Sequence, residues 1–107
     1  MEHFKDLTIL SETDESYIGI CSCCSTINLV YKNIAIKFPE EEFNIFRDYI
    51  EKIKPEDFIF ESRTGKNIFM ATPVKNIVLC FSTSEIWELK AMMTQASLML
   101  EVNRILK

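Results

Sequence analysis

The sequence predicts an α+β domain in which two βββα-like halves form an antiparallel sheet that two helices cover on one face. Three observations predict this fold: short stretches of strand composition joined by turn residues, two stretches with helical periodicity, and a similarity between the two halves. A chain of 107 residues fits one domain, residues 1–107, because a body of this size buries about two-thirds of its unfolded surface.

The first half is predicted to begin with four short strands, at residues 4–10, 17–21, 27–31 and 34–38. A polar, acidic loop at 11–16 follows the first strand, and residues 22–25 form a turn between the second and the third. Lys32-Asn33 joins the last two strands, because asparagine tolerates the positive φ of a type I′ hairpin turn.

A helix is predicted to follow the fourth strand. Pro39 stands at its first position, and Glu40, Glu41 and Glu42 lie near the positive end of the helix dipole. Its core-facing stripe comprises Phe43, Phe46, Ile50 and Ile53. Lys54-Pro55 ends the helix, since the residue before a proline disfavours helical geometry.

The second half is predicted to repeat this order, with strands at 58–62, 67–71 and 77–81 and a turn at 63–66. Lys75-Asn76-Ile77 repeats Lys32-Asn33-Ile34 after a shift of 43 residues. We interpret residues 17–54 and 58–107 as a possible duplication. Chance resemblance between two hairpin-plus-helix segments is the alternative.

The second helix is predicted to start at Ser82, which forms a capping box with Glu85, and to run to the end of the chain. One apolar stripe matches that of the first helix. A second stripe consists of Met92, Met99, Val102 and Leu106. A single sheet cannot cover both stripes, so either the two helices pack side by side or the second stripe makes a homodimer contact.

Charge and hydropathy exclude several kinds of partner. The net charge is −4 and the basic residues are scattered, so the chain lacks the basic stripe that binding to a nucleic-acid backbone requires. No apolar segment approaches the roughly 20 residues of a membrane span, and the first residues do not resemble a signal peptide. We therefore expect a cytoplasmic protein with no membrane partner.

Chemistry is concentrated in Cys21-Ser22-Cys23-Cys24, which holds three of the four cysteines. Thiolates two residues apart at a tight turn can bind one tetrahedral metal ion, so Cys21 and Cys24 are the first-choice ligands and Cys23 the third. We expect zinc first and copper(I) second. A closed zinc site needs a fourth ligand, and the sole histidine, His3, is the weakest candidate. Cys80 is expected to be solvent-accessible and not directed at the cluster.

Two other interpretations of the cysteines stay open. Cys21 and Cys24 could be an exchanging thiol pair of a redox protein, although thioredoxin-like pairs stand at the start of a helix and these lie between strands. The cysteines could also be inert small side chains in a dimeric scaffold. No catalytic residue is assigned, because His3 is the only candidate base for a cysteine and the two glycines form no phosphate-binding loop. The favoured function is thus non-enzymatic metal binding or an interaction role.

The cysteine tetrad, the following Ile27-Asn28-Leu29-Val30-Tyr31-Lys32-Asn33 segment and the pattern of Pro73, Asn76, Phe81 and Glu85 resemble a small bacterial family of unknown function, of Bacteroidetes type, with a CxCC motif. The resemblance covers most of the chain after Glu15. It implies a bacterial cytosolic protein of about this length, with no activity, ligand or partner to transfer.

Overall fold

The computed structural model describes residues 7–57 and 63–106, so His3 and the predicted strand at 58–62 lie outside the described residues. The strands are β1 (Leu7–Glu12), β2 (Ser16–Cys21), β3 (Ile27–Tyr31), β4 (Ile34–Phe38), β5 (Ile68–Ala71) and β6 (Val78–Phe81). The helices are α1 (Glu40–Lys52) and α2 (Thr83–Leu106), and a 3-10 turn, η2 (Pro55–Asp57), follows α1. The predicted α+β class is confirmed.

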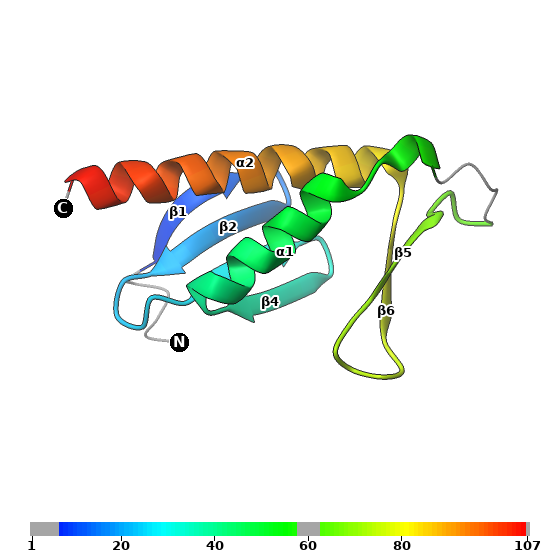
Figure 1. Ribbon diagram of the computed structural model, residues 1–107, viewed down its shortest axis with the longest axis horizontal. Coiled ribbons are helices and arrows are strands. Elements are labelled where there is room, and N and C mark those ends of the chain that lie inside the picture. The colour runs from blue at the N-terminus through cyan, green and yellow to red at the C-terminus, as the bar shows by residue number, and fades with distance from the viewer. Residues whose placement is uncertain (1–6, 58–62, 107) are drawn as a thin grey trace.

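The strands form two antiparallel sheets where one was expected. β1, β2, β3 and β4 pair in sequence order, and β5 and β6 form a separate hairpin. Figure 1 shows the reason: α1 carries the chain from the end of β4 to the opposite end of the molecule, where the hairpin stands beside the start of α2. The hairpin therefore does not extend the larger sheet.

The hairpin turns differ from their predictions in detail. β1 runs on to Glu12 with an irregularity after Ile9, so the acidic loop is shorter than residues 11–16. The two-residue turn at Lys32-Asn33 is confirmed by the pairing of Tyr31 with Ile34, but the positive φ of 53° falls on Lys32. β5 and β6 are joined by the longer loop 72–77, so the two hairpins are not equivalent in their turns and the repeat stays a prediction.

Both helices begin and end near the residues that the sequence indicated. Pro39 is the N-cap of α1 in an extended conformation, one position earlier than predicted, and three acids occupy the first turn. Phe43 and Ile50 are buried, and Phe46 and Ile53 pack against the core, which confirms the predicted stripe. In α2 the capping box is confirmed: the Glu85 amide donates to Ser82 Oγ at 3.2 Å, and the Ser82 amide donates to Glu85 Oε1 at 2.8 Å.

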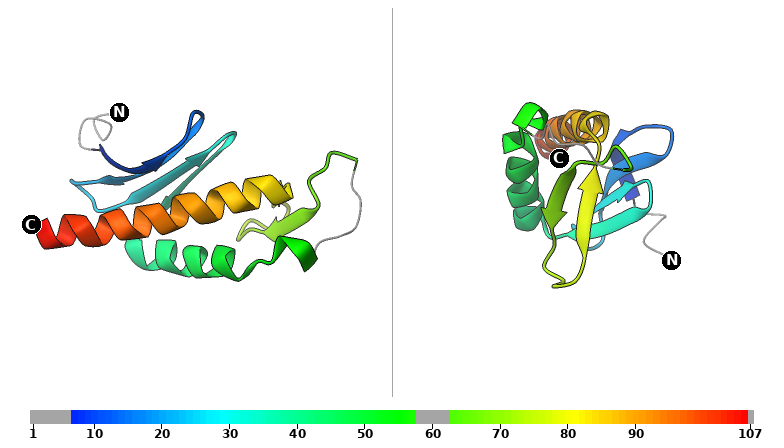
Figure 2. Two further views of the ribbon diagram at one scale, coloured as in Figure 1. Left: turned by 90° about the horizontal axis from the view of Figure 1, so that it is seen from above. Right: turned by 90° about the vertical axis from the view of Figure 1, so that its right-hand side faces the viewer.

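The two helices lie side by side on one face of the four-stranded sheet. Figure 2 shows α2 against the side of the sheet that holds β1 and β2, with α1 beside it toward β4. Met92 is 3% exposed and Met99 packs against the core, so packing within one chain accounts for both. Leu106 is 78% exposed. The predicted dimer contact through this stripe stays a prediction.

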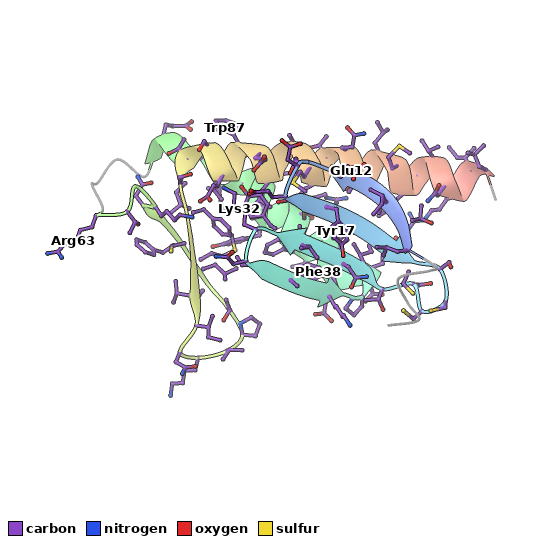
Figure 3. All side chains as sticks on the ribbon, turned by 180° about the vertical axis from the view of Figure 1, so that it is seen from behind. Glu12, Tyr17, Lys32, Phe38, Arg63 and Trp87 are labelled. Carbon is purple, nitrogen blue, oxygen red and sulfur yellow. The ribbon has the colours of Figure 1, made fainter. Side chains whose placement is uncertain are left out.

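One cluster of buried side chains joins the two sheets and both helices. Its members come from β1 to β6 and from α1 and α2. The opposite face of the four-stranded sheet carries no helix in the described part of the chain and leaves Tyr17 accessible, as Figure 3 shows. Among the described residues, neither helix combines the length and apolarity that a bilayer crossing requires.

Candidate metal centre

The cysteines lie in a tight loop between β2 and β3, as the sequence predicts. Cys21 is the last residue of β2, and Ile27 is the first residue of β3. The Cys21 amide donates to the Thr26 carbonyl at 2.9 Å, and the Ser25 amide donates to the Cys21 carbonyl at 2.8 Å. Ser25 completes the turn with a φ of 56°. The backbone therefore folds back on itself within a few residues and brings the three side chains together.

The three sulfur atoms of this cysteine cluster (Cys21, Cys23 and Cys24) converge. All three Sγ atoms lie within 4.8 Å of one another, and those of Cys21 and Cys23 are 2.9 Å apart. Cys21 is buried, whereas Cys23 and Cys24 are exposed. Cys21 is thus held in the sheet, whereas Cys23 and Cys24 stand at the surface.

The surroundings of Cys23 and Cys24 shift the pKa values of their thiols in opposite directions. Hydrogen bonds from the Thr26 side chain, from Cys21 and from the Thr26 backbone lower the pKa of Cys24 to about 6. A hydrogen bond with Cys21 is the main cause that raises the pKa of Cys23 to about 12. Of these two thiols, Cys24 therefore loses its proton the more readily, and a metal ion that binds Cys23 must displace its proton.

The sulfur positions fit a metal ion after a small adjustment. A zinc–sulfur bond of about 2.3 Å places tetrahedral thiolates roughly 3.7 Å apart. The described sulfurs span distances from 2.9 Å to at most 4.8 Å, which bracket that value. Because Cys23 and Cys24 are exposed, rotation of their side chains can make this adjustment without movement of the strands.

The two other candidate metal ligands are Cys80 and His3. Cys80 is exposed, as expected, and stands on β6 in the hairpin at the far end of the molecule from the cysteine loop (Figure 1), so it is not a member of the cluster. His3 lies outside the described residues. Leu7, four residues later, pairs with Cys21 across β1 and β2.

A groove of about 640 Å³ lies beside the cluster on the helix-free face of the sheet. Cys21 and Cys24 line one part of it, and Tyr17, Asn28 and Lys37 line others. Leu7 also lines the groove, and its side chain packs over Gly19, where a Cβ would lie only 3.0 Å from it. A ligand bound at the sulfurs would therefore have space on one side.

Sequence reasoning missed a second polar site at the start of α2. Glu85 is only 6% exposed, and its Oε2 accepts hydrogen bonds from the ammonium groups of Lys32 and Lys66, both at 2.9 Å. Burial alone would raise the pKa of Glu85, but the Lys32, Ser82 and Lys66 hydrogen bonds lower it to about 2. The capping box explained Glu85 on its own, so no sequence signal pointed to the two lysines.

A neighbouring contact extends this site along α2. The Tyr31 hydroxyl donates to Glu88 Oε1 at 2.6 Å. Burial is the main cause that raises the pKa of Tyr31, followed by this hydrogen bond. Tyr31 is the last residue of β3 and Lys32 begins the turn that follows, so the two contacts fasten the β3–β4 turn to the first turns of α2 (Figure 3). We assign the pair a structural role.

The fold and the site together define a small α+β protein with a surface cluster of three cysteines. The chain belongs to a family of unknown function, DUF6686, whose family model matches residues 1–106. This confirms the expected membership of a family without assigned activity, and the bacterial origin stays a prediction. A search of curated proteins and a search of solved structures each found no match.

Proposed function

We propose that this protein is a non-enzymatic metal-binding protein that holds a thiophilic ion, zinc first and copper(I) second, through Cys21, Cys23 and Cys24. The observation that carries the proposal is the convergence of three sulfur atoms within 4.8 Å of one another on a single loop. Thiolates are soft ligands that prefer these two ions to calcium or magnesium. Since the ligands must stay reduced, we place the protein in the cytoplasm.

Two of the three ligands stand at the surface, and this supports a binding role over a purely structural one. A structural zinc site is closed, with four protein ligands around the ion. Here only Cys21 is buried in the sheet, and the loop is held by its own backbone hydrogen bonds, Cys21 to Thr26 and Ser25 to Cys21. The ion would therefore bind to a loop that is already folded.

The fourth zinc ligand is proposed to be His3. The register supports this proposal, because Leu7 lies opposite Cys21 and four extended residues span at most about 14 Å. Copper(I) is satisfied by three thiolates and needs no imidazole. We therefore expect His3→Ala to weaken zinc binding and to leave copper(I) binding unchanged, which competition titrations with a chromogenic chelator would measure.

The direct test is metal analysis of untagged protein purified without chelator. We expect close to one zinc or copper ion per chain. The double variant Cys23→Ser, Cys24→Ser should bind at least about 100-fold more weakly, because the loss of even an indirect supporting group costs 10- to 100-fold. Both side chains are exposed, so the variant should keep the fold, which circular dichroism would verify.

Cys80→Ser is the matched control for that variant. It also replaces an exposed cysteine, but on the hairpin, and should bind metal as the wild-type protein does. The proposal would be overturned by wild-type protein that carries no metal, folds stably, and takes up neither zinc nor copper(I) when these are added under reducing conditions.

A second candidate function is thiol redox chemistry, which the 2.9 Å separation of the Cys21 and Cys23 sulfurs favours. The sequence had suggested Cys21 with Cys24 as the exchanging pair. Oxidation by diamide would remove two protons and two electrons from a pair of thiols, form one disulfide and reduce the diamide to its hydrazine.

This alternative predicts a reversible bond within the loop. Peptide mapping after mild diamide treatment and alkylation should then find Cys21 joined to Cys23 or Cys24, with recovery of all thiols after dithiothreitol. If alkylation finds all three thiols unchanged after diamide, the redox function is excluded. Zinc bound to the thiolates should protect them from diamide and from the alkylating reagent, so metal-free protein must be used.

A further inference from the structure

The β5–β6 hairpin has two apolar faces. Ile68, Met70 and Phe81 point into the core and are almost completely buried. The alternate positions, Phe69, Ala71, Val78 and Cys80, are all exposed and pair across the hairpin as Phe69 with Cys80 and Ala71 with Val78. An antiparallel sheet with one solvated face normally alternates apolar and polar residues. This outer face carries no charged side chain.

The apolar surface continues onto the loop at the end of the hairpin. Val74 is 52% exposed and Ile77 is 49% exposed, which is similar to Phe69 and Val78 in the strands. A two-stranded hairpin is only marginally stable in water, and exposed apolar patches rimmed by polar residues are typical of protein interfaces. The outer face therefore has the character of a docking surface.

Charge narrows the choice of partner. Residues 63–84 contain Arg63, Lys66 and Lys75 and no aspartate or glutamate, although the whole chain has a net charge of −4. Lys66 pairs with Glu85, so the positive charge offered to a partner comes from Arg63 and Lys75. Figure 3 shows Arg63 pointing away from the body of the molecule. A complementary surface must thus combine exposed apolar side chains with acids.

The outer face of α1 has this combination. Ile45 is 69% exposed and Tyr49, one turn further along, is 50% exposed. The exposed acids on the same helix are Glu41, Glu42, Asp48 and Glu51. Asp48 pairs with Arg47 at 3.1 Å, but α1 as a whole carries five acids and two bases. The surface is therefore apolar along its centre and acidic around it.

We propose that two copies of this chain exchange these surfaces, so that the outer face of each hairpin docks on the outer face of α1 of the other copy. The partner is a second copy because both complementary surfaces belong to the same sequence. A two-fold arrangement uses each surface once per chain and closes the assembly. A single hairpin-on-helix contact is small, but the two-fold axis creates two of them. Together they approach the area of a typical stable interface, which buries about 800 Å² per partner.

This dimer contact is separate from the α2 stripe that the sequence suggested. In that stripe Met92 is 3% exposed and Leu106 is 78% exposed, whereas the exposed apolar residues of the hairpin, such as Val78 at 55%, lie together on one face. The hairpin half of the contact lies at the opposite end of the molecule from the cysteine loop (Figure 1).

The test is the mass in solution, measured by size-exclusion chromatography with light scattering across the micromolar range. We expect wild-type dimer, and at least about a 10-fold higher dimer dissociation constant for Val78→Glu and for Ile45→Arg, since each places a charge in the apolar centre of the contact. Leu98→Glu is the matched control: Leu98 is 63% exposed on α2, outside both surfaces, and its variant should dimerise as the wild-type protein does.

A mixture of the two variants gives the sharpest result. In a heterodimer of Val78→Glu and Ile45→Arg chains, one contact has both wild-type surfaces and the other pairs the new glutamate with the new arginine. Equal amounts should therefore recover dimer that neither variant forms alone. This rescue would not occur if the substitutions acted by unfolding the chain.

Three outcomes would overturn the proposal: wild-type protein that is monomeric throughout the micromolar range, a dimer that Val78→Glu leaves intact, or failure of the mixture to recover dimer. Monomeric protein that sediments with phosphatidylserine vesicles, and ceases to do so as Lys75→Glu, would instead assign the cationic hairpin to an anionic lipid surface.

Discussion

The Glu85→Gln variant is expected to lose about 2 kcal/mol of unfolding free energy at pH 7, and the loss should shrink below pH 4.5 and disappear only as the pH falls through about 2. Glutamine retains the capping-box acceptor but not the charge that Lys32 and Lys66 share at 2.9 Å each. The fall in the pKa of Glu85 from 4.5 to about 2 corresponds to about 3 kcal/mol, and solvent around the half-exposed lysines reduces it.

The direction of the pH effect follows from the sign of this shift. The folded protein lowers the pKa of Glu85, so its contribution is complete above the ordinary value of 4.5 and is lost as the pH falls through about 2. Urea unfolding of both proteins at pH 7, 5 and 3 would measure the difference. A deficit of the same size at every pH would contradict an ionic origin.

Glu101→Gln is the control for this experiment. Glu101 pairs with Arg104 at 2.8 Å on α2, but its side chain is 65% exposed. Exposed pairs of this kind contribute roughly 0.3–0.5 kcal/mol. We therefore expect little change in stability at any pH from the control, which separates the buried site from general loss of negative charge.

Phe43→Ala is expected to cost about 3–5 kcal/mol of unfolding free energy, a large part of the stability of a domain of this size. Phe43 is fully buried, and its ring meets that of Phe38 edge-on, with centroids 6.1 Å apart. It fastens α1 to β4, and α1 packs in turn on α2. The cavity left by alanine would lie where the sheet and both helices meet.

Thermal and urea unfolding, followed by circular dichroism and by the fluorescence of Trp87, would measure this effect. Leu98→Ala, at a 63% exposed position, should change stability by less than about 0.5 kcal/mol. The single-domain prediction is tested in the same experiment: coincident transitions by both probes support one cooperative unit, and separate transitions would contradict it.

Local patterns in the sequence were enough to predict most of the elements. The stripe of Phe43 and Ile50 and the capping box of Ser82 with Glu85 are contacts within one turn or one helix face, so residue spacing determines them. The cysteine loop was predicted for the same reason, because turn residues between two strand-like stretches bring neighbouring side chains together.

Contacts between distant residues could not be predicted in this way. Lys32 and Lys66 lie 53 and 19 residues from the carboxylate that they share, and no spacing rule relates them. The separation of the hairpin from the larger sheet depends on the path of α1. Within the cysteine loop, the sequence favoured Cys21 with Cys24, whereas side-chain geometry also brings the sulfur of Cys23 to 2.9 Å from that of Cys21.

The sequence by itself determined the α+β class, the helix boundaries and the position of the three sulfurs in one loop, since short-range propensity and periodicity decide each of these. Only the tertiary structure decided that Met92 lies in the core, that Glu85 joins two lysines, and that the outer face of the hairpin is left exposed. These features depend on which surfaces meet when helices and sheets pack, and the packing of distant segments has no local signature.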